Sequence, residues 1–262
     1  MGLPDHRLHD DPAAARAQRA TDRRRLRRAF GWSVALVVAL LVVFSAQDAG
    51  AFDWRAWTLR PWSAAGLAGL VGAPLLHGSG GHLAANSMAL LVLGTLAGSV
   101  YPRATLPALP VLWIGGGVGA WLLGEPGSHH LGASGLTHGL GFLVFTLGVL
   151  RRDRASIAAA CIGVFLYGGM LMTVLPREAG ISWESHLGGA VAGIACAIAL
   201  RRRDPIPPRK RYSWEIEEDL EAEAARERDS FEPARPDAVP VIWERLPRED
   251  ERGTILEFPR RE

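Results

Sequence analysis

Six long apolar stretches constrain the fold of this chain more than any other feature of its sequence. They lie at about residues 30–46, 83–100, 106–123, 133–150, 156–175 and 185–200. Each holds roughly 16 to 20 residues, close to the ~20 that a helix needs to cross ~30 Å of hydrocarbon. Helices are favoured over strands because the stretches are long and lack an alternating pattern. The sequence therefore predicts an all-α, polytopic membrane protein with six transmembrane helices.

A seventh apolar segment covers residues 62–76, but it is short, rich in glycine and contains Pro74 near its end. We interpret it as an interfacial or re-entrant segment that leads into His77. It is therefore not counted among the six predicted spans.

The arginines predict the orientation of the helices. They precede the first stretch, follow the second, separate the fourth from the fifth and follow the sixth; they are Arg23, Arg24, Arg25, Arg27, Arg28, Arg103, Arg151, Arg152, Arg154, Arg201, Arg202 and Arg203. With six crossings they all fall on one side, which the positive-inside rule makes cytoplasmic. Both termini are then cytoplasmic, in a membrane expected to be a bacterial-type plasma membrane, and residues 47–80, 124–132 and 176–184 face outward.

The first stretch has an alternative interpretation. Residues 23–51 have the basic flank and apolar length of a cleaved signal peptide, with a small-residue site at Ala49-Gly50-Ala51. We favour an uncleaved anchor. Cleavage would leave the other five helices in the same orientation.

The charge distribution predicts three parts: a basic cytoplasmic segment (1–29), a six-helix membrane domain (30–203) and a charged cytoplasmic tail (204–262). The tail carries 17 acidic and 11 basic residues, so we expect it to be mostly disordered, with one helix from Ser213 to about Arg228. The basic residues before it flank apolar segments instead of forming a face, which argues against nucleic-acid binding. Cys161 and Cys196 lie inside apolar stretches, and neither a disulfide nor a metal or organic cofactor is implied.

Four polar residues stand at the heads of apolar stretches that share the outward side. Ser134 lies in the sequence GASG, His186 begins the last stretch, and His82 and Asn86 begin another within the sequence HGSGGHLAAN. Polar groups at membrane depth are costly and rare unless they serve a function. A hydroxyl, an imidazole and amide-type donors at one depth are the parts of an acyl-transfer site.

This pattern resembles the rhomboid family of intramembrane serine proteases over about residues 62 to 200. The matching residues are His77, His82, Asn86, Gly132, Ser134, Gly135, His186, Gly189 and Gly193. The resemblance implies that Ser134 is the nucleophile and His186 the general base, without a carboxylate as third member. It also implies an oxyanion hole made by the side chains of His82 and Asn86 and the backbone N–H of Ser134, with His77 as loop support.

Small residues are expected to bring the two catalytic helices together. Gly135 and Gly139 lie four apart on one helix, and Gly189 and Gly193 lie four apart on another. Helix axes approach closely over such pairs, and this approach would place Ser134 beside His186.

Two features depart from the family pattern. His138 stands four residues after Ser134, where many members carry a Tyr stacked on the catalytic histidine; an imidazole there could stack but also compete as a base. Trp54-Arg55 is a pair of the kind found in the family's first outward loop, at an unusual distance from His77. We expect Glu184, the acid nearest in sequence to His186, to point elsewhere on its helix.

The sequence thus predicts an endopeptidase that cleaves single-span membrane proteins near the outer boundary of the lipid bilayer. One alternative is a catalytically inactive membrane chaperone with the same fold. Another is a His-lined metal or proton transporter, since His77, His82, His129, His130, His138 and His186 all fall on the outward half. The oligomeric state is not predicted.

Overall fold

The computed structural model describes residues 12–176, 180–205 and 213–231. Within these residues the elements are helical, with one isolated β-bridge between Leu59 and His130. The chain divides into two units, Met1–Pro208 and Arg209–Glu262. The second unit contains α8 (Ser213–Phe231), where the sequence predicts a helix; the rest of the predicted disordered tail lies outside the described residues, apart from 204 and 205.

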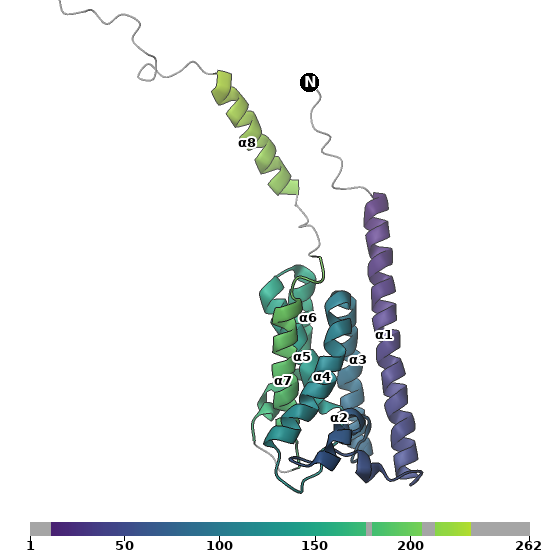
Figure 1. Cartoon of the computed structure of the whole chain (residues 1–262). Helices are drawn as coiled ribbons and strands as arrows, with labels where there is room; N and C mark the ends of the chain where they lie inside the picture. The colour runs from purple at the N-terminus through teal and green to yellow at the C-terminus, as the bar shows by residue number, and fades with distance from the viewer. Residues whose placement is uncertain (1–11, 177–179, 206–212, 232–262) are drawn as a thin grey trace, which may run out of the picture. The chain divides into compact units, whose positions relative to one another are not determined.

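The first unit is built from long helices joined by short helical turns (Figure 1). The long helices are α1 (Pro12–Asp48), α3 (Gly80–Val100), α4 (Pro102–Leu123), α5 (Ser134–Arg151), α6 (Arg154–Tyr167) and α7 (Trp183–Leu200). The turns are η2 (Trp54–Trp57), η3 (Ala64–Ala68), α2 (Gly69–Gly72), η4 (Ala73–Leu75) and η5 (Gly168–Val174). Helices α3, α5 and α7 all begin at one end of the bundle, which is called the site end below.

Four described helices, α1, α3, α4 and α7, are long and apolar enough to cross a membrane. Polar side chains at the head of α5, with Arg151 at its end, reduce its apolar character. The predicted fifth span does not form one α-helix over residues 156–175: α6 ends at Tyr167, and Gly168 and Gly169 begin the 3-10 helix η5. The segment 62–76 forms only the short turns η3, α2 and η4.

The ends of the helices follow ordinary capping chemistry. The Ser79 side chain accepts a hydrogen bond from the amide of His82 and so caps α3. The Asp153 side chain accepts from the amide of Ser156 and caps α6. Helix α5 ends where Arg152 adopts a left-handed conformation, with φ of 57°. These local signals set where the helices begin and end around the site.

Glycines let α4, α5 and α7 pack backbone to backbone. A Cβ on Gly189 would overlap the carbonyl group of Gly135, and one on Gly193 would overlap the carbonyl oxygen of Gly139. On the other side of α7, a Cβ on Gly188 would overlap the carbonyl oxygen of Gly115 on α4. The sequence identified the α5 and α7 pairs but not the contribution of α4. The result is close approach of the helices that carry Ser134 and His186.

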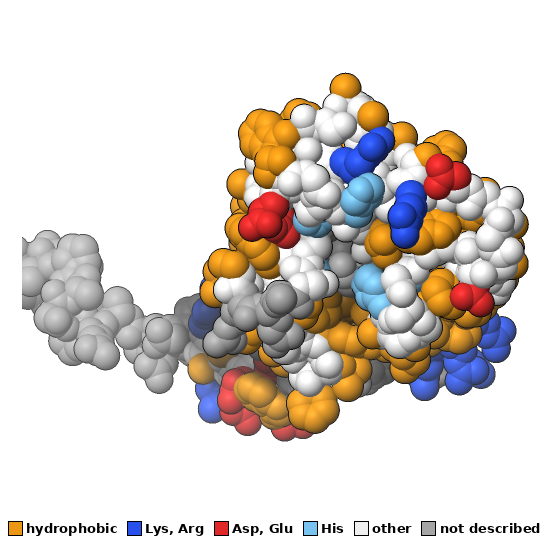
Figure 2. Space-filling model, turned by 90° about the horizontal axis from the view of Figure 1, so that it is seen from below, with side chains coloured by type: hydrophobic (Ala, Val, Ile, Leu, Met, Phe, Trp, Pro, Cys, Tyr) orange, Lys and Arg blue, Asp and Glu red, His pale blue; other side chains and the backbone are white. Residues whose placement is uncertain are grey.

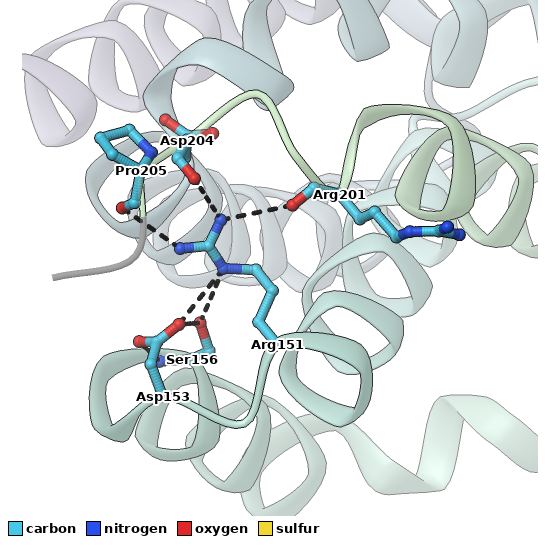
Figure 3. Close-up of polar contacts among 6 residues, drawn as sticks. All are labelled: Arg151, Asp153, Ser156, Arg201, Asp204 and Pro205. Atoms are coloured by element: carbon cyan, nitrogen blue, oxygen red, sulfur yellow. Dashed lines mark hydrogen bonds and ion pairs between the residues drawn. The ribbon is translucent and has the colours of Figure 1, made fainter. Parts of the chain in front are cut away.

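A polar cluster joins the helix ends opposite the site end (Figure 3). The Arg151 guanidinium donates to the carboxylate of Asp153 at 3.2 Å and to the backbone carbonyl of Asp204 at 2.7 Å. The Asp204 side chain accepts from the amides of Arg103 and Ala104, at 3.0 and 2.9 Å. Arg151 thereby connects the end of α5 with the start of α6 and the chain after α7, and Asp204 connects that chain with the start of α4.

Candidate active site

The sequence-predicted polar residues line one cavity at the site end, with a volume of about 960 Å³. Its walls include Ser134, His186, His82, Asn86 and His138. Figure 2 views the molecule from this end and shows histidine side chains near the middle of the face. The cavity is therefore reached from the loops and holds residues from α3, α5 and α7.

Ser134 is the first residue of α5. The turn before it requires Gly132, whose φ of +115° is a conformation that L side chains rarely adopt. The backbone carbonyl of Ser134 accepts hydrogen bonds from His138 and Thr137. This local geometry presents the Ser134 side chain at a helix N-terminus, where backbone N–H groups are free of intrahelical partners.

His186 is held in one tautomer by a backbone carbonyl. Its Nδ1 lies 3.0 Å from the carbonyl oxygen of Thr173 in η5, and a carbonyl only accepts, so Nδ1 carries the proton. The unprotonated Nε2 is then available as a base on a ring that lines the cavity with Ser134. In the described part of the chain there is no direct hydrogen bond between this ring and the Ser134 hydroxyl. Thr173 carried no sequence signal, because any residue supplies a backbone carbonyl.

His138 stacks flat on His186. The ring centroids are 3.8 Å apart and the planes differ by 12°. Nδ1 of His138 donates to the carbonyl of Ser134 at 2.7 Å, while Nε2 lies 2.9 Å from the Thr173 hydroxyl. The imidazole thus occupies the stacking position considered from the sequence, and it contacts the Ser134 carbonyl on α5 and the Thr173 hydroxyl in η5.

His82 and Asn86 both lie beside the turn that precedes Ser134. A Cβ placed on Gly132 would lie 2.8 Å from Nε2 of His82 and 3.6 Å from Nδ2 of Asn86. Asn86 is buried, and its Nδ2 has no hydrogen-bond partner among the residues described. An unpaired buried donor is costly, and a developing oxyanion in the cavity is one acceptor that would satisfy it.

His77 lies behind this turn, outside the predicted spans, and is fully buried. The amide of Ala133 donates to its Nε2 at 3.5 Å, and its ring meets that of His82 edge-on, with centroids 5.1 Å apart. Burial, and secondly the neighbouring His82, lower the pKa of His77 to about 4. His77 is therefore a neutral imidazole at neutral pH that accepts from the loop before Ser134.

A second polar group lies on the rim of the cavity. His130 Nδ1 is 2.6 Å from the Ser182 hydroxyl, which lies 3.4 Å from the Glu184 carboxylate. Glu184 lines the same cavity as His186, but within the described residues its carboxylate contacts Ser182 and not His186, consistent with the expectation that it points elsewhere on its helix. Burial lowers the pKa of His130, although Glu184 acts in the opposite direction.

The structure also shows where His129 and the Trp54-Arg55 pair lie. Nδ1 of His129 lies 2.7 Å from the Thr58 hydroxyl. Trp54 and Arg55 form part of η2 and are not among the residues that line the cavity. Among the described residues, no group of three His, Cys, Asp or Glu side chains is arranged to hold a metal ion.

Comparison with known proteins supports the family resemblance. A model of the rhomboid domain matches residues 64–203. Uncharacterized proteins of Mycobacterium tuberculosis and Mycobacterium bovis are each 41% identical over 150 residues, which is 54% of this chain and 62% of theirs. An uncharacterized protein of Mycobacterium leprae is 37% identical over 140 residues, 50% of this chain and 55% of its own. The chain thus spans less than two thirds of the relatives it matches. With its rhomboid domain and four apolar helices of spanning length, the chain belongs to the rhomboid family and is an integral membrane protein.

Proposed function

We propose that this protein is an intramembrane serine endopeptidase that acts through a Ser134–His186 dyad. The observation that supports it most is the hydrogen bond from His186 Nδ1 to the Thr173 carbonyl. This bond leaves Nε2 unprotonated on a ring that shares a cavity with the Ser134 hydroxyl. A backbone carbonyl would thereby perform the orienting role that a carboxylate has in Ser-His-Asp triads.

The chemistry would proceed in two stages. Nε2 of His186 would take the proton of the Ser134 hydroxyl as its oxygen attacks the scissile carbonyl carbon, and then give it to the departing amine. In the second stage Nε2 would take a proton from a water molecule that attacks the acyl-enzyme, and would return it to the Ser134 oxygen as the acyl group leaves. His82, Asn86 and the Ser134 N–H would donate to the oxyanion, each worth about 3 kcal/mol of transition-state stabilisation.

The proposed substrates are single-span membrane proteins, cleaved near the outer boundary of the bilayer. A substrate helix keeps its carbonyls hydrogen-bonded, so the cleaved segment must become extended before attack. The cavity opens at the site end, where an extended segment and water can enter together. The proposal includes six membrane crossings, of which α5 is the fourth and α6 with η5 the fifth. It also includes a cytoplasmic location for both termini.

A non-catalytic chaperone would need the fold but not the proton arrangement at His186. The alternative of a His-lined transporter would need histidines that coordinate an ion or pass protons through the bundle. The described residues give no support to the metal transporter, because they contain no group of three His, Cys, Asp or Glu side chains that could hold a metal ion.

The test compares the wild-type protein with Ser134→Ala in membranes that contain a labelled single-span substrate. We expect Ser134→Ala to abolish cleavage and covalent labelling by a serine-reactive probe, while the unfolding temperature stays nearly unchanged. Ser99→Ala, near the other end of α3, is the matched control and should cleave normally. Undiminished cleavage by Ser134→Ala would rule out the proposed dyad.

A further inference from the structure

The last turn of α1 holds the backbone of His77 by two hydrogen bonds. Nε2 of Gln47 donates to the carbonyl oxygen of His77 at 2.7 Å, and the amide of His77 donates to Oε1 of Gln47 at 3.2 Å. Both residues are buried, Gln47 with 9% and His77 with 0% of its surface exposed. A side-chain amide is suited to this pairing because it offers one donor and one acceptor side by side.

His77 in turn contacts the residues on the oxyanion side of the site, which comprises His82 and the turn before Ser134. Its ring accepts from the amide of Ala133, the residue before Ser134, and meets the ring of His82 edge-on. The same turn is fixed from its other side, where the amide of Gly132 donates to the carbonyl of Ala73 at 2.8 Å. A shift of the His77 backbone would therefore displace both the turn and His82.

We propose that Gln47 is a positioning residue, through which α1 sets the oxyanion side of the active site by fixing His77. This inference rests on the proposed protease function and adds a residue to it. Gln47 precedes the 64–203 range that the rhomboid domain matches. The proposal therefore gives α1 a part in catalysis, whereas its composition indicates only a membrane anchor.

The first experiment replaces Gln47 by Met, which keeps the length of the side chain and removes both hydrogen bonds. We expect kcat for a single-span substrate to fall about tenfold with KM within twofold, because misplaced oxyanion donors weaken binding of the transition state more than binding of the substrate. Ser33→Ala is the matched control, since Ser33 is also buried on α1 but packs near Gly94 of α3. It should retain wild-type kcat.

The second experiment asks whether Gln47 acts through His77. His77→Phe keeps a ring beside His82 but loses the acceptor for Ala133 N–H. If the route is correct, adding Gln47→Met to His77→Phe lowers kcat less than threefold further, as expected for residues that act as a unit. A full, additive loss in the double variant would overturn the proposal.

Should Gln47→Met fail to fold, Gln47→Glu provides the decision. It keeps the size and the acceptor, and in its ionised form it cannot donate to the His77 carbonyl, so kcat relative to wild type should fall once the pH is high enough to ionise the carboxyl. Wild-type kcat in folded Gln47→Met, wild-type kcat in Gln47→Glu at every pH tested, or a rise in KM alone would overturn the inference. Ser134→Ala in the same assay separates the two proposals. If cleavage does not depend on Ser134, both the protease function and the role of Gln47 are wrong. If cleavage depends on Ser134 but Gln47→Met has wild-type kcat, only the role of Gln47 is wrong.

Discussion

At the scale of single residues, the unusual feature is a pair of stacked imidazoles. His138 and His186 lie 3.8 Å apart, and both contact Thr173, one through its hydroxyl and the other through its carbonyl. Two ionisable rings this close cannot gain protons independently, so their titrations are coupled. The pH dependence of catalysis should therefore reflect the pair and not His186 alone.

Replacing His138 by Tyr tests this coupling. A phenol ring can keep the stacking contact but does not ionise on the acid side of neutrality. We expect kcat within about tenfold of wild type and an acid limb of the kcat/KM profile that fits a single ionisation. The measurement is a pH series in detergent with one substrate. Complete loss of activity would instead make His138 a member of the proton relay.

The sequence predicted the residues whose chemistry depends on their side chains. Ser134, His186, His82 and Asn86 were named from spacing and type, and all four line the cavity. Thr173 and Gln47 were missed for different reasons. Thr173 acts through its backbone carbonyl, which no sequence pattern reveals, and a lone Gln at a helix end has no motif.

At the scale of helices, Arg151 joins several chain segments at the end opposite the site. Its side chain is 5% exposed and contacts the Asp153 carboxylate, the Ser156 hydroxyl and the carbonyls of Arg201, Asp204 and Pro205. The Arg151 guanidinium also lies over the Tyr101 ring, 5.5 Å from its centroid. A planar group with five donors suits this position, and a lysine would not reproduce it.

Arg151→Ala is therefore expected to lower the free energy of unfolding by about 3 kcal/mol, since it leaves a carboxylate and several carbonyls without their donor. The measurement is denaturant or thermal unfolding in micelles. Arg152→Ala is the control, because Arg152 is exposed and its side chain bonds only the nearby carbonyl of Val149 in the described residues. Equal stability of the two variants would contradict the assigned role.

The contact between Arg151 and Asp153 also predicts how the stability of the fold depends on pH. Burial tends to raise the pKa of Asp153, but hydrogen bonds from Ser156 and Arg151 outweigh it and hold the pKa below its ordinary value of 3.8. A carboxyl with a lowered pKa stabilises the fold above its unfolded pKa and loses this effect as the pH falls through the folded value. Arg151→Ala removes one cause of the lowered pKa, so as the pH falls this variant should lose the stabilisation by Asp153 at a higher pH than wild type, nearer 3.8.

The helices themselves were largely predictable, and their exceptions have local causes. Apolar length located α1, α3, α4 and α7. The predicted fifth span failed as one helix because Gly168 and Gly169 end α6 and start η5. That interruption places the Thr173 carbonyl beside His186. Thr173 lies in the last turn of η5, where helix carbonyls lack intrahelical partners, so its carbonyl is free to accept from His186.

At the scale of the whole molecule, the candidate site and the rhomboid match at 64–203 lie in the first unit, which ends at Pro208. Asp204 belongs to that unit as a structural residue, because its carboxylate caps the start of α4 and its carbonyl accepts from Arg151. The boundary that matters for folding should therefore lie after Asp204 and not at the end of α7.

Two truncations test this boundary. A chain that stops after Pro208 should keep the unfolding temperature and the Ser134-dependent cleavage of the full chain, because every contact described for the site and the Arg151 cluster remains. A chain that stops after Arg203 loses the cap of α4 and two acceptors of Arg151, which should cost about 2 to 4 kcal/mol of stability. Both are compared with the full chain by thermal unfolding and substrate cleavage in the same detergent. If the shorter chain matched the longer one, Asp204 would have no structural role; if both lost activity, the tail would contribute to the enzyme.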